Sequence, residues 1–448
     1  MDLLHFEITP DVIYNRQLSL WQIEVCYGTR ELRDSVANHY TYGTVEMSAL
    51  KIIEQTMNAR TAKVFDYVYK YNNRGNDVYE QVLNRPATLA VQEKQKLIID
   101  EFQRWIYADE RRREQLEECY NDAFVGFASS PYDGSFLHFP DLNPDITLYP
   151  HQKDAIARIL LSGENVLLSH DVGTGKTYEM IAGVHELKRM GLSEKNLIVV
   201  PNTVLKATVD AHKLLYPDDK ILAVFPKDFG PKDRAEVLEH IRDNDYTAVY
   251  MAYSSFDMIV MSKDYWINKW QKEIRAIKAA ISNSQYSSEE SQLKREKKAL
   301  SKKLSKYALE AVDTPWLTFD ALGINTLVVD EAHNYKNIPI KSRTDSIVGM
   351  HATGSKKCTE MLEKAHLVDR LILATGTPLT NSLADLFVMQ TYLQPRELRF
   401  REIDNFDMWI NCFGERETNF EIDVDTNGLR EMTRFSTFHN LTELMSLF

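Results

Sequence analysis

The feature that most constrains the fold is a glycine-rich segment between a short apolar run and a helical pattern. The apolar run is residues 165–168 (NVLL), the segment is residues 169–177 (SHDVGTGKT), and helical periodicity continues to residue 188. Glycines at such a junction let successive backbone N–H groups point inward and cradle phosphate oxygens at a helix N-terminus. The strict pattern has glycine where this chain has His170, but the core Gly-x-Gly-Lys-Thr is intact. The residues predicted to bind nucleotide phosphates in this loop are Gly173, Thr174, Gly175, Lys176 and Thr177.

An acidic pair follows a second apolar run. Residues 326–329 (TLVV) lead into Asp330, Glu331, Ala332 and His333. In a nucleotide site, one carboxylate at the tip of a strand can hold the Mg²⁺ that bridges the phosphates, and a second can activate the attacking water. We assign the first role to Asp330, together with the Thr177 hydroxyl, and the second to Glu331. The tetrapeptide alone is weak evidence, and its position after a buried strand gives it meaning.

Short apolar runs alternate with amphipathic stretches of helical length after about residue 148. Continuous rather than alternating apolar character indicates strands that are buried on both faces. Strand-helix alternation predicts an α/β fold with a parallel sheet, on which ligands bind at the carboxyl ends of the strands. The runs are residues 165–168, 197–200, 221–225, 248–251, 326–329 and 371–374.

The rest of the chain divides by pattern. Residues 1–127 show helical periodicity and predict a mainly helical accessory domain, and residues 128–147 are rich in turn formers and predict a linker. Residues 264–310 interrupt the strand-helix alternation with a lysine-rich helical insertion. Its charge fits a solvated face, or alternatively a contact with DNA. Residues 148–395 are then the α/β lobe, and residues 396–448 form a tail.

Composition excludes several classes of protein. With 44% hydrophobic and 26% charged residues, the chain has the make-up of a globular protein without a membrane segment, and no run approaches the ~20 apolar residues of a membrane helix. The N-terminus lacks a signal-peptide pattern, so we expect a cytoplasmic protein. The net charge of −12 means that any nucleic-acid contact must come from a local surface. Four widely spaced cysteines are expected to be free thiols: Cys26, Cys119, Cys358 and Cys412.

Taken in order, the motifs resemble those of superfamily-two DEAH helicases and translocases of the Swi/Snf type. Residues 148–152 (LYPHQ) resemble the adenine-reading segment before motif I, and residues 330–337 (DEAHNYKN) resemble motif II. Residues 199–205 resemble motif Ia, residues 252–256 motif Ib and residues 375–379 motif III. The resemblance spans residues 148–395 and implies the first RecA-like P-loop NTPase lobe of a DNA motor.

The resemblance also implies roles for single residues. Gln152 would read the adenine edge of ATP, and His333 would couple hydrolysis to lobe movement through motif III. The motif III residues concerned are Thr375, Gly376 and Thr377. The residues implied to lie along the nucleic-acid backbone are Pro201, Asn202, Thr203, Ser254 and Ser255. ATP and Mg²⁺ are the implied cofactors, and double-stranded DNA is the implied partner.

The flanks show a looser resemblance to bacterial methylase-helicase polypeptides of phages and mobile elements. It rests on residues 42–44 (YGT), 92–95 (QEKQ) and 132–135 (YDGS) in the N-terminal stretch, and on residues 440–445 (NLTELM) in the tail. It implies DNA as the track, with an associated methyltransferase as a further partner.

A second RecA-like lobe is expected in cis or in trans. Motifs IV to VI of the family belong to that lobe, and residues 396–448 are too few for a domain of ~100 to 150 residues. We therefore expect the chain alone to bind ATP but hydrolyse it weakly. Two other interpretations stay open: the motor part of a restriction-modification or DNA-protection enzyme, and an ATP-switched DNA- or protein-binding adaptor.

Overall fold

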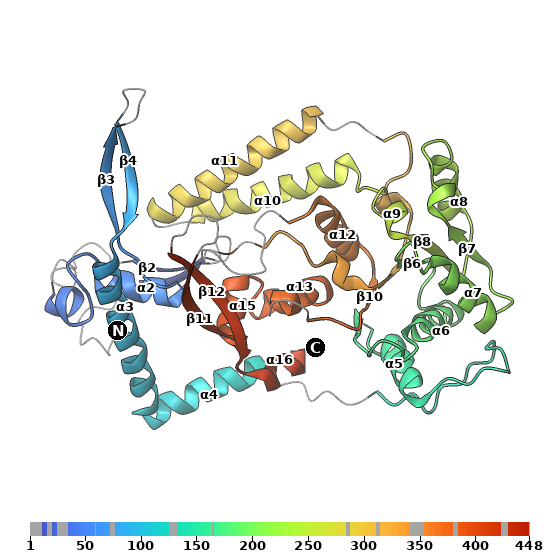
Figure 1. Ribbon diagram of the computed structural model, residues 1–448, viewed down its shortest axis with the longest axis horizontal. Helices are drawn as coiled ribbons and strands as arrows, with labels where there is room; N and C mark the ends of the chain where they lie inside the picture. Colours follow the sequence, from blue (N-terminus) through green and yellow to red (C-terminus); the bar gives the residue numbers. More distant parts are fainter. Residues whose placement is uncertain are drawn as a thin grey trace.

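The computed structural model describes residues 11–15, 20–24, 35–58, 60–71, 77–124, 132–163, 165–283, 287–310, 314–340, 342, 354–379, 384–422 and 429–447. A six-stranded parallel sheet forms the centre of the region after residue 148 (Figure 1). Its strands are β5 (Val166–Leu168), β6 (Asn196–Val200), β7 (Ile221–Val224), β8 (Ala248–Ala252), β9 (Thr326–Asp330) and β10 (Arg370–Ala374). They lie in the order β5-β10-β9-β6-β8-β7, and every ladder is parallel. The predicted α/β class is confirmed, and each of the six apolar runs is a strand.

Burial on both faces explains the continuous apolar runs. Successive strand side chains point to opposite faces of a sheet. Val199 and Leu327 accordingly belong to one core cluster, whereas their neighbours Ile198 and Val328 belong to the other. One face is covered by α5 (Pro150–Leu161), α6 (Lys176–Arg189) and α7 (Leu205–Leu215). The other is covered by α8 (Arg234–Asp243), α12 (Lys356–Leu367), α13 (Ala384–Leu393), α14 (Pro395–Phe400) and α15 (Phe406–Phe413).

The strand order brings the predicted motifs to one edge of the sheet. Parallel strands end on the same side, so the loops after β5, β9 and β10 are neighbours. β9, which ends in the acidic pair, is not adjacent to β5, which leads into the glycine loop. Instead β10 pairs with both β5 and β9 and lies between them. Thr375, which follows β10, therefore sits between Ser169 and Glu331.

The predicted helical insertion is a hairpin of α10 (Lys263–Asn283) and α11 (Ser287–Glu310), which run side by side along one side of the molecule (Figure 1). Ile277 and Leu293 are buried in the seam between the helices, and Leu300 packs against them. The short helix α9 (Tyr253–Phe256) precedes the hairpin directly after β8.

The N-terminal region is mainly helical, as predicted, and it contains β-hairpins as well. Its helices are α2 (Ala49–Met57), α3 (Arg85–Tyr107) and α4 (Glu110–Phe124). Two antiparallel hairpins accompany them: β1 (Asp11–Asn15) with β2 (Leu20–Glu24), and β3 (Phe65–Tyr71) with β4 (Asp77–Leu83). Aromatic residues alternate along β3 with Asp66, Val68 and Lys70, a period-2 pattern typical of a strand, although Tyr67 and Val68 are both exposed in the fold. The predicted boundary at residues 127–128 lies outside the described residues.

The C-terminal tail packs on the lobe. A hairpin of β11 (Gly414–Ile422) and β12 (Leu429–Phe438) leads to α16 (Leu441–Leu447). Leu444 and Leu447 of α16 are buried in the same core cluster as Trp409 of α15. In Figure 1, α4 and α16 lie side by side, and Tyr120 of α4 hydrogen-bonds Glu443.

Two further expectations concern the chemistry of the chain as a whole. Within the described part of the chain, every helix is too short or too polar to span a bilayer. Cys119, Cys358 and Cys412 are free thiols, as expected, and Cys26 lies outside the described residues.

Candidate nucleotide site and nucleic-acid face

The glycine loop between β5 and α6 has the backbone that its sequence predicts. Gly173 and Gly175 have φ of 90° and 93°, a region that residues with a side chain rarely adopt. A Cβ on Gly175 would also lie 2.2 Å from Nε2 of Gln152. The positive φ therefore favours glycine at position 175, and a side chain there would also displace the Gln152 amide.

The Lys176 side chain is hydrogen-bonded to backbone carbonyl groups of the glycine loop. Its Nζ donates hydrogen bonds to the carbonyl oxygens of His170 (2.7 Å) and Asp171 (2.9 Å). The Thr174 hydroxyl donates to the same Asp171 oxygen at 2.8 Å. Because Lys176 is also the first residue of α6, a fixed positive charge lies next to the unpaired N–H groups at the start of a helix.

Residues at the start of α5 support the loop from one side. Gln152 is buried, accepts from the Tyr149 backbone N–H at 2.9 Å, and donates to the Thr174 carbonyl oxygen at 3.2 Å. His151 donates to the same oxygen through Nε2 at 3.0 Å. Gln152, predicted to read adenine, thus contacts the phosphate loop directly.

The departure at His170 has a partner that explains it. Nδ1 of His170 donates to Oε1 of Glu179 at 2.8 Å, and Glu179 is completely buried in the first turns of α6. Burial raises the pKa of Glu179, and the interactions with His170 partly offset that rise. A glycine at position 170 would leave this buried carboxyl without its partner.

The acidic pair lies at the end of β9. Asp330 accepts from the backbone N–H of Glu331 at 3.0 Å. Burial and the neighbouring charge of Glu331 raise the pKa of Asp330 to about 6, and the positive charge of Lys176 acts against them. The loop lysine and the acidic pair are therefore close enough to interact, although they are more than 150 residues apart in sequence.

Motif III joins these two segments. Nδ1 of His333 lies 3.1 Å from Oγ1 of the buried Thr375, 3.4 Å from Oγ1 of Thr377 and 3.3 Å from Oε2 of Glu331. The Thr375 backbone N–H donates to the Leu168 carbonyl oxygen at 3.0 Å, just before the glycine loop.

The glycine of motif III lies against the glycine loop itself. A Cβ on Gly376 would lie 3.6 Å from Nζ of Lys176 and 2.9 Å from Cγ2 of Val172. The three predicted segments thus meet at one place, where a side chain at position 376 would press on the glycine loop.

The predicted nucleic-acid residues lie further along the same sheet edge. Asn202 is exposed after β6; its Nδ2 donates to Oγ of Ser254 at 3.0 Å, and its Oδ1 accepts from the Ser254 backbone N–H at 3.3 Å. Thr203 is exposed beside them, and Pro201 is half-buried. Ser255 differs, because its side chain is only 1% exposed and its hydroxyl points into the core. Successive helical residues point about 100° apart, so Ser254 and Ser255 do not share a face.

Comparison with known proteins identifies the family. A family model described as a probable helicase domain matches residues 159–448, more than half of the chain. The chain belongs to this helicase family. A second model, for a domain of unknown function, matches residues 2–125 of the helicase chain.

Individual relatives of this helicase agree with the motifs. The chain is 23% identical over 406 residues to Defense against restriction protein B of Escherichia phage P1, covering 80% of the chain and 18% of the relative. It is 24% identical over 261 residues to the human SWI/SNF-related matrix-associated actin-dependent regulator of chromatin subfamily A member 1, covering 57% of the chain and 18% of the relative. The chain thus spans less than a fifth of the length of these relatives. The resemblance to Swi/Snf-type helicases and to a phage protein is confirmed.

A solved structure also aligns with the helicase chain. The Sulfolobus solfataricus SWI2/SNF2 ATPase core in complex with dsDNA is 17% identical, with a TM-score of 0.35 over 62% of this chain and 41% of that chain.

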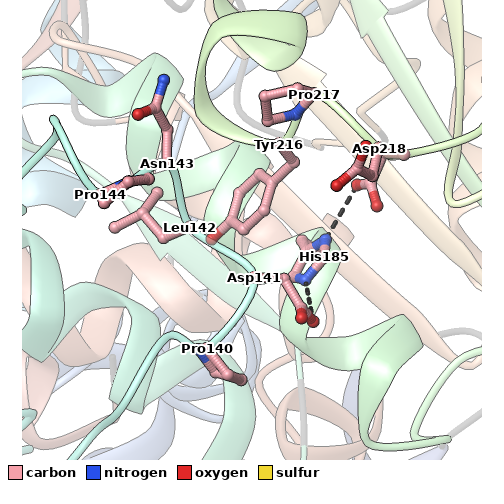
Figure 2. Close-up of a pocket in the computed structure, with 10 residues that line it drawn as sticks. Pro140, Asp141, Leu142, Asn143, Pro144, His185, Tyr216, Pro217 and Asp218 are labelled. Carbon is pink, nitrogen blue, oxygen red and sulfur yellow. Dashed lines mark hydrogen bonds and ion pairs between the residues drawn. The ribbon is translucent and has the colours of Figure 1, made fainter.

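A separate cavity of about 450 Å³ lies under the segment that precedes α5 (Figure 2). His185, which lines it, is nine residues along α6 from Lys176, roughly 13 Å by the rise of a helix. The cavity is therefore distinct from the glycine loop. Its lining residues are Pro140, Asp141, Leu142, Asn143, Pro144, His185, Tyr216, Pro217, Asp218 and Asp219.

An ionic network forms one wall of this cavity, in which the two histidines are buried, Asp219 is half-buried and Asp141 is exposed. Nδ1 of His185 donates to Asp219 at 2.8 Å, and Nε2 faces Asp141 of the overlying segment at 3.3 Å (Figure 2). His212 also donates to Asp219 at 2.8 Å and contacts the Tyr250 hydroxyl through its other nitrogen. Because both nitrogens of His185 face carboxylates, the ring donates from both as an imidazolium. Burial opposes this charge, but the hydrogen bonds to Asp219 and Asp141 outweigh it and raise the pKa of His185.

This network gives a stability prediction. His185→Gln should lower the free energy of unfolding by about 1.5 to 3 kcal/mol at pH 6, because a charged hydrogen-bond partner of the half-buried Asp219 is lost. Because the pKa of His185 is raised in the fold, its charged form stabilises the folded state. This stabilisation is complete below the unfolded-state pKa of about 6.5 and is lost as pH rises through the folded-state pKa. The difference between variant and wild type in urea unfolding should therefore shrink from pH 6 to pH 9. Equal differences at both pH values would mean that His185 is not charged in the fold.

Proposed function

We propose that this chain is the first ATPase lobe of a helicase or translocase, which binds Mg-ATP and, together with a second RecA-like lobe, couples its hydrolysis to movement on double-stranded DNA. The observation that carries the proposal is the meeting of Lys176, Asp330 and Thr375 at one edge of the sheet. A P-loop lysine, an acidic strand tip and a coupling segment at one place are what phosphoryl transfer from a nucleotide requires.

Each residue has a defined part in this mechanism. Lys176 exchanges its bonds to the His170 and Asp171 carbonyl oxygens for bonds to the β- and γ-phosphates. Thr177 and Asp330 would hold Mg²⁺, which supplies positive charge to the phosphate oxygens. Asp330 is suited to this role, because a bound cation would offset both the burial and the charge of Glu331 that raise its pKa. Glu331 orients a water molecule and accepts its proton.

Coupling to movement would run through His333. Its Nδ1 lies within hydrogen-bond reach of Oε2 of Glu331 and of the hydroxyls of Thr375 and Thr377. A change at the γ-phosphate therefore reaches motif III through a single side chain. A second lobe, in cis or in trans, would close on this surface, and we expect weak turnover from the chain alone.

DNA is the proposed track. The support from this chain is the pair Asn202 and Ser254, which present amide and hydroxyl groups without a strong positive charge, as contacts to a phosphate backbone can do. The relatives point the same way, since one is named as a regulator of chromatin and another as a defense against restriction. The name of the phage relative favours protection of DNA from restriction as the setting. The looser resemblance of the flanking segments is the ground for proposing an associated methyltransferase as a partner of the motor.

The DNA face can be tested with the double variant Asn202→Ala, Ser254→Ala. Losing two hydrogen-bonding groups should weaken binding of a short DNA duplex about tenfold, at 0.5 to 1.5 kcal/mol for each. Affinity for a non-hydrolysable ATP analogue should stay unchanged. Asn244→Ala serves as the control, because Asn244 follows α8 at the opposite edge of the sheet, where its amide donates to the His240 carbonyl oxygen. Unchanged duplex affinity in the double variant would remove these residues from the interface.

A further inference from the structure

Two tyrosine side chains connect the acidic pair, Asp330 and Glu331, with α9, the helix that contains Ser254. Tyr253, which precedes Ser254 in α9, shares its single hydroxyl hydrogen between the carbonyl oxygens of Asp330 and, at 3.0 Å, of Glu331. Tyr335 belongs to the short 3-10 helix Ala332–Tyr335 that follows the acidic pair. Its hydroxyl donates at 2.9 Å to Asp257, the residue that ends α9. Each of the two segments thus places a tyrosine side chain against the other, an arrangement that we call the Tyr253–Tyr335 exchange.

The exchange is packed as a unit. The rings of Tyr253 and Tyr335 meet edge to face with centroids 5.1 Å apart, and Tyr335 is only 1% exposed. Nζ of Lys357 lies over both rings, at 5.0 Å and 4.4 Å, and 3.7 Å from Asp257. The buried Lys364 donates to the Phe256 carbonyl oxygen at 3.0 Å. Helix α9 is therefore held both to the acidic pair and to α12.

The backbone of Glu331 depends on this exchange. Glu331 has φ of 51°, a left-handed conformation that a residue with a side chain keeps only when its surroundings hold it there. Its carbonyl oxygen accepts from the Tyr253 hydroxyl and from both the backbone N–H and Nδ2 of Asn334. The Asn334 bonds are local, whereas Tyr253 comes from 78 residues away. A shift of α9 would therefore move the carbonyl that fixes Glu331.

We propose that the Tyr253–Tyr335 exchange links DNA contact at Ser254 to the position of Asp330 and Glu331, so that the two tyrosines are positioning residues for the coupling between DNA and nucleotide. The inference rests on the proposed function, because it concerns the partner and the cofactor named there. The path has one covalent step, from Ser254 to Tyr253, and one hydrogen bond, from Tyr253 to the acidic pair. Coupling of this kind is reciprocal: DNA strengthens nucleotide binding by the same factor by which nucleotide strengthens DNA binding.

The test measures this factor at equilibrium in the full chain, without hydrolysis. The affinity for a short DNA duplex is measured with and without a saturating non-hydrolysable ATP analogue and Mg²⁺. Wild type should show a difference of about fivefold or more. Tyr253→Phe and Tyr335→Phe keep the rings and remove one hydroxyl each. Both should bring the factor close to one while each separate affinity stays within about threefold of wild type, as expected for the loss of a coupling contact alone.

Two further variants sharpen the result. Tyr246→Phe removes a buried tyrosine hydroxyl that contacts His240 of α8, away from both surfaces, and should leave the coupling factor unchanged. Asp257→Ala removes the acceptor of Tyr335 without touching either ring, and should lose coupling as the tyrosine variants do.

The outcomes separate this inference from the proposed function. A wild-type factor of one, or full coupling in both tyrosine variants, would overturn the inference. Loss of the separate affinities in those variants would also overturn it, because the tyrosines would then serve only the fold. If instead Lys176→Ala binds the ATP analogue as well as wild type, it is the proposed nucleotide site that fails.

Discussion

Replacing Lys176 with alanine is expected to weaken binding of a magnesium-nucleotide by at least about 100-fold. The side chain lies at the centre of the glycine loop, where its Nζ contacts two carbonyl oxygens and faces Gly376. Two charge-assisted hydrogen bonds to phosphate, at about 1.5 to 3 kcal/mol each, give a loss of this size. Equilibrium titration with a fluorescent ATP analogue measures it directly.

The matched control for this variant is Lys206→Ala. Lys206 is an exposed lysine on α7 that pairs only with Asp210 in the next turn. Its removal takes away the same charge and should leave nucleotide affinity at the wild-type level. Similar losses in both variants would attribute the effect to overall charge, and no loss in Lys176→Ala would exclude the glycine loop as the phosphate site.

Glu331→Gln is expected to keep nucleotide binding and to remove turnover. Glutamine preserves the shape of the side chain but cannot accept the proton of the attacking water, and a general base contributes about 10² to 10⁴ in rate. The fall should appear in ATP hydrolysis stimulated by DNA, measured in the protein together with its second lobe. Affinity for the ATP analogue should stay within about threefold of wild type, since the proposed role is in the transition state alone.

The two variants separate binding from chemistry. Lys176→Ala should lose both, and Glu331→Gln should lose only hydrolysis. Equal and mild effects from the two would contradict a common site. A strong loss of nucleotide affinity in Glu331→Gln would show instead that this carboxylate holds the metal, and that the roles of Asp330 and Glu331 need to be exchanged.

Local patterns in the sequence predicted what depends on local physics. The six strands were visible because a strand buried on both faces must be apolar at every position, as Val199 and Ile198 are on opposite faces of β6. The glycine loop was visible because positive φ at Gly173 and Gly175 demands glycine in this setting.

Contacts between distant segments could not be predicted in the same way. Nothing in the sequence around Thr375 reveals that β10 lies between β5 and β9, since strand order is set by packing of the whole lobe. Tyr253 and Tyr335 lie inside recognisable motifs, but each bonds to the other's segment about 80 residues away, so neither had a visible role. β3 carried an alternating aromatic pattern that the helical interpretation of residues 1–127 did not use. Ser255 was assigned to the nucleic-acid backbone, but its side chain in α9 points into the core.

His170 illustrates how structure resolves a mismatch. By sequence it departs from the phosphate-loop pattern, which casts doubt on the geometry of the loop. In the fold it is the hydrogen-bond partner of the buried Glu179, so the two positions depend on each other. A reader of sequence could find this pairing only by noticing an acidic residue nine positions later on the buried face of a helix.

The Mg²⁺ dependence of nucleotide affinity in Asp330→Asn tests the central claim most directly. If the glycine loop and the acidic pair hold one magnesium-nucleotide, Mg²⁺ should strengthen binding of the ATP analogue to wild type, and this gain should be lost in the variant. Binding of the analogue without Mg²⁺ should be nearly the same in both proteins. A full Mg²⁺-dependent gain in Asp330→Asn would contradict the account, because the acidic pair would then serve some site other than the nucleotide.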